Sequence, residues 1–514
     1  MLIPYEGSLK QFKHVIYHEL VHVFINDGVY GGSIMAALKN RVVIPLWMNE
    51  GLAEYLASDW DANSDMWLRD LVINSDQIPD IPYLNGMLAY RGGQSVWEFI
   101  TNKWGDEIIA DIFYNIKSKK NVNKGIEASL NINIKELSKQ WHQYIKKIYW
   151  PDIELRDDIR EIGFPLTNHI ESYTTYNVGS EVSPDQMKVA MYSNKNGVMS
   201  IYLISLESGE IIKKVVSGQK TSKFEELHFL KPGVTWSPDG QFLAFSVKSG
   251  SSDALIIVDT KNIKKTITKK FNLKSIYRPK WNPINNSIAF IGHNNFSSDV
   301  FIYDFDQDTL EQITNDVYSD IQITWNPTGD ELLLVSDRAN YISSPYLYTD
   351  IFSLTDHDVN NYDIYNLNLD GSINRLTDTP FNETYACFSP DGNKIAYISD
   401  ESGINNIYIT SDNFDTSYSI TNILTGITQL DWYANDEMLF TGFYKSGYDI
   451  FRISNIDDKL RKNQKIVPAK WKNKKKYNLL RESEQYVPNQ EGKSLQYHQF
   501  IDSQNKLNIN SIDM

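Results

Sequence analysis

Six copies of a short pattern, a turn followed by an apolar strand, recur along the later part of the 514-residue chain. The copies begin at Val182, Trp236, Trp281, Trp325, Phe388 and Trp432. Counted from the second residue of each copy, the spacings are 54, 45, 44, 63 and 44 residues. A period near 44 residues is typical of a β-propeller, in which each four-stranded blade provides one repeat.

The turns themselves support this interpretation. In the Ser-Pro-Asp-Gly sequence at 237–240, proline presets φ at the first turn position, and Asp-Gly tolerates the positive φ that reverses the chain. Because one blade cannot bury its faces alone, six blades are expected to close into a ring over residues 160–455. The longest interval contains a Tyr-rich polar insertion at 343–360, which we expect to form a loop on one rim.

Residues 1–155 have a different pattern, which predicts helices. Apolar residues recur with a period near 3.6 over 46–56, 94–104, 106–116 and 134–149. Gly105 separates the second and third of these segments, and Pro151 ends the last. The predicted fold class is therefore multidomain, with a mainly α domain followed by an all-β six-bladed propeller.

The first helical segment contains His18-Glu19-Leu20-Val21-His22, which is an H-E-x-x-H motif. Two imidazoles four residues apart lie on one face of a helix, where both can bind a single zinc ion with a glutamate beside them. The neighbouring apolar residues predict that this helix is buried: Val15, Ile16, Leu20, Val21, Val23 and Phe24. The alternative is a core helix with two hydrogen-bonded histidines.

The third zinc ligand is expected from the second helical segment. A catalytic zinc site has three protein ligands and leaves the fourth position open for water. Glu50 is the candidate, because its apolar neighbours would bury it and a buried carboxylate needs a cation. Glu54, one turn later, would accept a hydrogen bond from a zinc-bound imidazole. The opposite assignment, with Glu54 as the ligand, and a solvated face carrying both residues remain alternatives.

Together, H-E-L-V-H at 18–22 and W-M-N-E-G-L-A-E-Y at 47–55 resemble the gluzincin metallopeptidases, which include thermolysin and the peptidase MA-like families. The resemblance covers roughly residues 10–150 and implies a zincin-like catalytic domain. It implies one zinc ion bound by His18, His22 and Glu50, with Glu19 as the catalytic carboxylate. The aminopeptidase motif G-A-M-E-N is absent.

The same resemblance assigns further roles. Tyrosines stabilise the oxyanion in several gluzincins, and Tyr90 is the candidate here, with a packing tyrosine as the alternative. Arg91 is a weaker candidate for recognising a substrate carboxylate, and His14 is expected at the surface or behind the ligands. Such peptidases place a sheet before the catalytic helix. Few residues precede it here, so we expect this chain to be part of a longer protein.

The repeats of residues 160–455 resemble TolB-like six-bladed propellers and the propellers that precede prolyl oligopeptidase domains. No G-x-S-x-G motif lies within or after them, so serine peptidase chemistry is not predicted. The resemblance implies that the propeller binds a protein or peptide, or gates access to a site. Residues 456–514 are polar and partly basic, which predicts a solvated tail or the start of another domain.

Composition limits the partners and the chemistry. A net charge of −15 argues against nucleic acid as the main partner. Cys387 is the only cysteine, which excludes an intrachain disulfide and a thiolate metal site. The sequence contains no transmembrane run and no signal peptide. The resemblance to a peptidase joined to a TolB-like propeller implies an extracytoplasmic location for the full-length protein: periplasm, outer membrane or secreted.

These features lead to one functional expectation, zinc-dependent hydrolysis of peptide bonds in a peptide or protein substrate. The alternative from another class is an inactive, propeller-based binding or scaffold protein of the cell envelope. A purely structural zinc site is disfavoured, because such sites are normally closed by four protein ligands.

Overall fold

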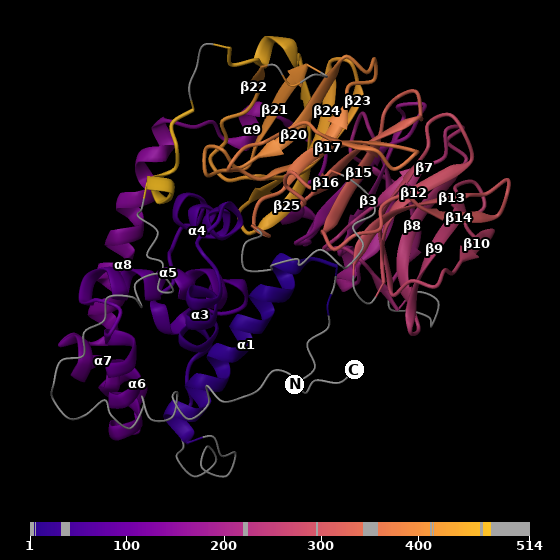
Figure 1. Ribbon diagram of the computed structural model, residues 1–514. Helices are drawn as coiled ribbons and strands as arrows, with labels where there is room; N and C mark the ends of the chain where they lie inside the picture. The colour runs from indigo at the N-terminus through magenta and orange to yellow at the C-terminus, as the bar shows by residue number, and fades with distance from the viewer. Residues whose placement is uncertain are drawn as a thin grey trace, which may run out of the picture. The chain divides into compact units, whose positions relative to one another are not determined.

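The computed structural model describes residues 5, 7–31, 42–218, 225–294, 297–342, 358–411, 414, 416–462 and 466–473 (Figure 1). These residues form a helical part followed by strands. Residues 474–514 and the greater part of the predicted insertion at 343–360 lie outside the described residues. No helix of the described part is long and apolar enough to cross a membrane.

The helical part covers the first third of the chain. Its main helices are α1 (Leu9–Tyr30), α3 (Leu46–Ala57), α4 (Ala62–Asn74), α5 (Met87–Trp104), α6 (Ile108–Lys119), α7 (Val122–Leu130) and α8 (Ile134–Tyr149). The short helical turns are η1 (Ile81–Tyr83), η2 (Trp150–Glu154), α9 (Ile159–Ile162) and α10 (His169–Ser172). The predicted segment 134–149 coincides with α8, and the segment 94–104 is the later part of the longer α5.

One hydrophobic core joins these helices. Trp47 of α3, Trp97 of α5 and Trp141 of α8 are each at most 1% exposed. The Trp97 indole N–H donates to the carbonyl oxygen of Met48 at 3.0 Å, and the Trp141 indole N–H donates to Ser95 Oγ at 3.2 Å. Each large side chain therefore fills the core and has its one polar group paired.

Helix α1 begins and ends at clear capping residues. The Ser8 hydroxyl accepts from the Gln11 amide at 3.3 Å, and Gly31 ends the helix in a left-handed conformation with φ of 67°. The predicted burial of the whole segment is wrong. Val21 is buried, but Leu20, Val23 and Phe24 are 43%, 55% and 64% exposed. The apolar residues surround the helix, and only the face with Val21 packs against α3 and α6.

The remaining described strands form six sheets, one for each blade. The first two blades are β2 (Asn177–Val182), β3 (Lys188–Ser193), β4 (Ser200–Ser205) and β5 (Ile211–Ser217), then β6 (Glu226–Leu227), β7 (Val234–Trp236), β8 (Phe242–Ser249), β9 (Ser252–Asp259) and β10 (Thr266–Lys269). The next two are β11 (Ser275–Trp281), β12 (Ser287–His293), β13 (Ser298–Asp304) and β14 (Thr309–Gln312), then β15 (Asp320–Trp325), β16 (Glu331–Ser336), β17 (Asp363–Asn368) and β18 (Ile373–Arg375). The last two are β19 (Glu383–Phe388), β20 (Lys394–Ser399), β21 (Asn406–Ser411) and β22 (Ser417–Ser419), then β23 (Ile427–Ala434), β24 (Glu437–Tyr444) and β25 (Gly447–Ser454).

The ring closes through strand exchange between distant parts of the sequence. The short strand β1 (Phe164–Pro165) pairs antiparallel with β25 and becomes the fourth strand of the last blade. Strand β2 of the first blade also packs against β23, β24 and β25. These contacts complete a six-bladed propeller, as the repeats predict. Each predicted turn connects the first two strands of a blade, and the apolar strand after it is buried.

Part of the segment 456–514, predicted as a solvated tail or the start of another domain, packs against the propeller. The Trp471 indole N–H donates to the Gly403 carbonyl oxygen at 3.0 Å, and the Ala469 amide donates to the Ser402 carbonyl oxygen at 2.7 Å. Residues 466–473 therefore belong to the folded part.

Candidate metal centre

The candidate centre lies between two helices that face each other with matching one-turn spacing. Helix α1 provides His14, His18 and His22, and α3 provides Glu50 and Glu54. Because residues four apart occupy one helix face, the histidines and the glutamates form two opposing rows. Figure 1 shows α3 beside both α1 and α5.

The first group of the centre contains the three predicted zinc ligands. His18 Nε2 lies 3.2 Å from Glu50 Oε2, and His22 Nε2 lies 3.3 Å from the same oxygen. The two Nε2 atoms are 3.2 Å apart. A tetrahedral zinc ion with bonds of about 2.0–2.1 Å places its ligand atoms roughly 3.3–3.4 Å from one another. The three atoms therefore have nearly the mutual separations that one zinc ion requires.

Other features of this group agree with a metal site. The three side chains are 12–18% exposed, so they are largely buried but not sealed from solvent. Two imidazoles and a carboxylate are the donor types that zinc accepts in catalytic sites.

The second group surrounds Glu54, which is buried. Its Oε1 lies 3.2 Å from His18 Nδ1 and 3.4 Å from His14 Nε2, and its Oε2 accepts from Arg91 Nη1 at 2.5 Å. Burial alone would raise the pKa of the Glu54 carboxyl, but the two histidines and the Arg91 guanidinium lower it well below its usual range. Glu54 is therefore a stable carboxylate behind His18.

The same contacts affect His18. Burial lowers the pKa of this imidazole, but the neighbouring Glu54 and Glu50 carboxylates outweigh burial and raise it. With Glu54 on the Nδ1 side, the ring presents Nε2 towards Glu50 and His22. At 3.2 Å from Nδ1, Glu54 occupies the place of the carboxylate that orients a metal-binding histidine.

Tyr90 and Glu19 complete the surroundings of the first group. The Tyr90 ring lies nearly parallel to the His18 ring, with an interplanar angle of 15° and centroids 6.2 Å apart. Burial, followed by the Glu50 charge, raises the pKa of the Tyr90 hydroxyl, with smaller contributions from Glu54 and Glu19. The hydroxyl is therefore kept protonated beside Glu50. Glu19 is half-buried on α1 between the two histidines of the motif.

Two glycines allow α5 to approach α3 closely. A Cβ atom on Gly51 would lie 2.4 Å from the Gly93 carbonyl carbon, and one on Gly93 would lie 2.3 Å from the Trp47 carbonyl oxygen. Helix α5 carries Tyr90 and Arg91, so this close packing brings both residues to the centre. This close contact is the physical reason for a glycine directly after Glu50.

His14 is partly exposed and lies against Glu54, as expected for a residue at the surface or behind the predicted ligands. Arg91 pairs with Glu54, which argues against the suggested role in recognising a substrate carboxylate. The signal for His14 was present, because it continues the four-residue spacing of His18 and His22.

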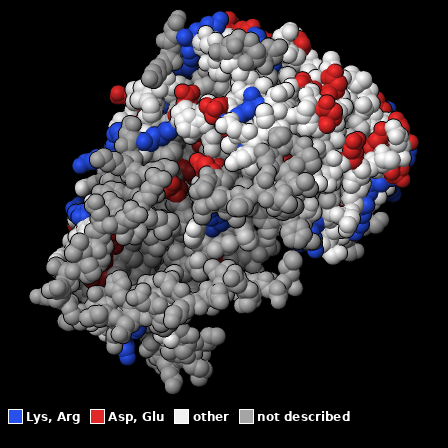
Figure 2. Space-filling view, in the orientation of Figure 1, with Lys and Arg blue, Asp and Glu red and all other residues white. Residues whose placement is uncertain are grey.

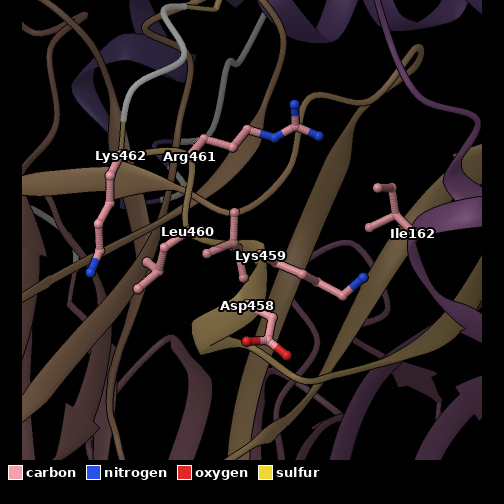
Figure 3. Close-up of a pocket in the computed structure, with 7 residues that line it drawn as sticks. Ile162, Asp458, Lys459, Leu460, Arg461 and Lys462 are labelled. Atoms are coloured by element: carbon pink, nitrogen blue, oxygen red, sulfur yellow. The ribbon is translucent and has the colours of Figure 1, made fainter.

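Other surface features are separate from the centre. A hollow of about 580 Å³ is lined by Ile162, Ile420 and residues 458–462, none of them from α1 or α3 (Figure 3). On the visible face of the propeller, acidic and basic side chains are interspersed (Figure 2). No broad basic surface for nucleic acid is seen on the described residues of that face.

No protein-family model and no curated protein sequence matches this chain. Among solved structures, the chain is similar to a putative TolB from Agrobacterium tumefaciens, with a TM-score of 0.38 and 16% identity over 55% of this chain and 90% of that one. It is also similar to TolB from Acinetobacter baumannii, with a TM-score of 0.36 and 17% identity over 63% of this chain and 71% of that one.

A third similar structure is an oligogalacturonate lyase in complex with manganese, with a TM-score of 0.36 and 13% identity over 57% of this chain and 93% of that one. These likenesses concern the fold. The strand pairing of the chain itself establishes the six blades.

Proposed function

We propose that this protein is a gluzincin-type zinc peptidase, whose helical catalytic domain is joined to a propeller that binds or gates a peptide or protein partner. The observation that carries the proposal is the set of three distances between His18 Nε2, His22 Nε2 and Glu50 Oε2, 3.2–3.3 Å. A sequence motif alone requires only that two histidines share a face. Here Glu50 Oε2, from a residue 28 positions beyond His22 in the sequence, lies at nearly the separation that tetrahedral zinc would require.

The residues around the centre have the chemistry that peptide hydrolysis needs. Zinc bound by His18, His22 and Glu50 would lower the pKa of a bound water towards about 7 and polarise the scissile carbonyl. Glu19 would accept the proton from this water and return it to the leaving amine. Tyr90, whose raised pKa keeps its hydroxyl protonated, would donate to the carbonyl oxygen as negative charge develops there.

A peptidase assay on the full chain tests the proposal. Hydrolysis of a library of fluorogenic peptides should be lost after chelation and restored by one equivalent of zinc. Glu19→Gln should reduce kcat by roughly 10²–10⁴-fold, the usual contribution of a general base. It should leave bound zinc unchanged, because Glu19 is not a ligand. Tyr90→Phe should lower kcat with little change in KM, since the donor would act only as charge develops.

The alternative of an inactive scaffold predicts a different result. If one zinc ion is bound at intact ligands but no peptide in the library is cut, the peptidase proposal fails and the scaffold alternative is favoured. If the folded chain binds no zinc, the ligand assignment itself is contradicted.

A further inference from the structure

The two groups of the centre repeat the same arrangement one helical turn apart. Glu50 lies between His18 and His22, at 3.2 and 3.3 Å, and Glu54 lies between His14 and His18, at 3.4 and 3.2 Å. His18 belongs to both groups and uses a different ring nitrogen in each. Nε2 faces Glu50 and Nδ1 faces Glu54.

We propose that His14 Nε2, His18 Nδ1 and Glu54 Oε1 form a second, weaker site for a divalent metal ion, bridged to the first by the His18 ring. The inference rests on the proposed function in one respect, since His18 is shared with the zinc site described above. The three atoms lie within 4.8 Å of one another, and two imidazole nitrogens with a carboxylate oxygen suit zinc.

The surroundings explain how an ion would enter and how the site would be completed. The His14 side chain is 29% exposed, whereas Glu54 is 5% exposed. An ion can therefore approach from the His14 side and keep water in its remaining positions, while the carboxylate is shielded behind it.

Two features make the second site weaker than the first. Arg91 Nη1 lies 2.5 Å from Glu54 Oε2, so a cation already neutralises the carboxylate and would repel an incoming metal ion. In addition, the His18 ring would bind both ions, one at Nε2 and one at Nδ1, and two cations on one imidazole would repel each other. We therefore expect the second dissociation constant to exceed the first by roughly tenfold or more.

Titration of the metal-free full chain with Zn²⁺ tests the inference, with calorimetry for the affinities and elemental analysis for the stoichiometry. The wild-type protein should bind two ions in two steps. His14→Gln should lose the weaker step, because it removes one ligand of the second site. The dissociation constant of the tighter step should change by less than about threefold, because His14 is not a ligand of the first site. His22→Ala should lose the tighter step and retain binding at the His14 side.

The results distinguish the inference from the proposed function. A single step in the wild-type protein, or two steps that both persist in His14→Gln, would overturn the second site while leaving the first intact. Absence of any binding to the wild-type protein would contradict both sites.

Arg91→Gln provides an independent variant that does not depend on the folding of the His14 substitution. It frees the Glu54 carboxylate from its cation, so the weaker step should tighten by roughly tenfold, the size of effect that groups behind ligands have on metal affinity. An unchanged or weakened second step in this variant would contradict the inference. Circular dichroism of each variant confirms that it is folded.

Discussion

Glu54 lies next to three ionisable side chains of the centre. His14, His18 and Arg91 all lie within 3.4 Å of its carboxylate oxygens. Because it stands behind His18, Glu54 would affect a bound metal ion through the orientation and basicity of that proposed ligand. Its charge also balances the Arg91 guanidinium.

Glu54→Gln should therefore weaken zinc binding at the first site by about 10- to 100-fold, the usual effect of losing such a partner. Competition with a chromophoric chelator measures this affinity. Glu127→Gln, at an exposed position of α7, makes the same chemical change away from the centre and should leave the affinity unaltered. Equal affinities for the Glu54 variant and the wild type would show that the carboxylate does not support His18.

A second prediction at the residue scale concerns a buried carboxyl in the propeller. Burial, followed by the Asp320 charge, raises the pKa of Asp299 to about 8. Its Oδ2 accepts from Ser297 Oγ at 2.6 Å and its Oδ1 from the Asp316 amide at 3.2 Å. The nearby Arg338 pairs with Asp316 and Asp320, so it does not neutralise Asp299 directly.

The sign of the effect follows from the raised pKa. The folded protein holds the Asp299 proton that the unfolded chain releases near pH 4, so stability should fall as pH rises from about 4 to about 8. Asp299→Asn removes this titration. The free energy of unfolding of the variant minus that of the wild type should therefore increase between pH 5 and pH 8, by about 1 kcal/mol or more. Denaturant melts at both pH values measure the difference, and an unchanged difference would contradict the assignment.

At this scale, the sequence predicts the residues whose relation is local. His18, Glu19 and His22 are recognisable because helical geometry fixes their spacing, and Glu50 because apolar neighbours make an unpaired carboxylate costly. The pairing of Arg91 with Glu54 spans 37 residues and depends on how α5 packs against α3. No local pattern contains that information.

At the scale of the elements, the approach of α3 and α5 depends on Gly51 and Gly93. A methyl group on Gly51 would meet the Gly93 backbone at 2.4 Å, and backbone atoms of two packed helices cannot move independently. The helices would have to separate, and Tyr90 and Arg91 would then move away from Glu50 and Glu54.

Gly51→Ala should therefore destabilise the helical part by about 1–3 kcal/mol, the usual cost of overpacking, although alanine has the higher helix propensity. Zinc affinity should fall as well. Gly28→Ala is the matched control, because Gly28 also lies inside a helix but has nothing within 4 Å of its added Cβ. It should stabilise the protein by about 0.5–1 kcal/mol. If both substitutions stabilise, the helices are not held together as described.

The elements also show where an apolar pattern misleads. Helix α8 was predicted closely because its apolar residues occupy one face. Helix α1 has apolar residues on all sides, and periodicity alone does not indicate which face packs. The neighbours of α1, not its composition, decide that Val21 is buried and Phe24 is exposed.

At the scale of the molecule, the segment before α1 attaches the candidate metal helix to the propeller. Ser298 Oγ donates to the Gly7 carbonyl oxygen at 2.7 Å, and the Leu9 amide donates to Ser319 Oγ at 3.1 Å. The hydroxyls of Ser8 and Tyr362 are 3.0 Å apart in a buried contact. These bonds span two blades, so the start of α1 is fixed by residues about 300 positions away in the sequence.

Tyr362→Phe removes one of these bonds and leaves the Ser8 hydroxyl buried without that partner. We expect a loss of about 1 kcal/mol and faster amide hydrogen exchange in the first turns of α1. Hydrogen exchange with mass spectrometry measures this rate. Tyr114→Phe removes the hydroxyl of a 73% exposed tyrosine on α6 and should change neither quantity. Unchanged exchange in α1 would show that the propeller does not fix this helix.

The sequence predicts the propeller because its blades repeat and each turn is a local signal. It does not predict the contacts between the first residues and the blades, since hydrogen bonds between Ser8 and Tyr362 leave no periodic pattern in either segment. The closure of the ring by β1 is likewise invisible, because Phe164 and Pro165 alone do not indicate a strand.

The central claim is that one zinc ion is held by His18, His22 and Glu50 with a position left open for water. X-ray absorption at the zinc edge, on the full chain loaded with one equivalent of zinc, tests it most directly. We expect four nitrogen or oxygen ligands at about 2.0–2.1 Å, two of them imidazoles, and the loss of one imidazole signal in His22→Ala. Three or more imidazoles, or a spectrum unaffected by His22→Ala, would contradict the assignment.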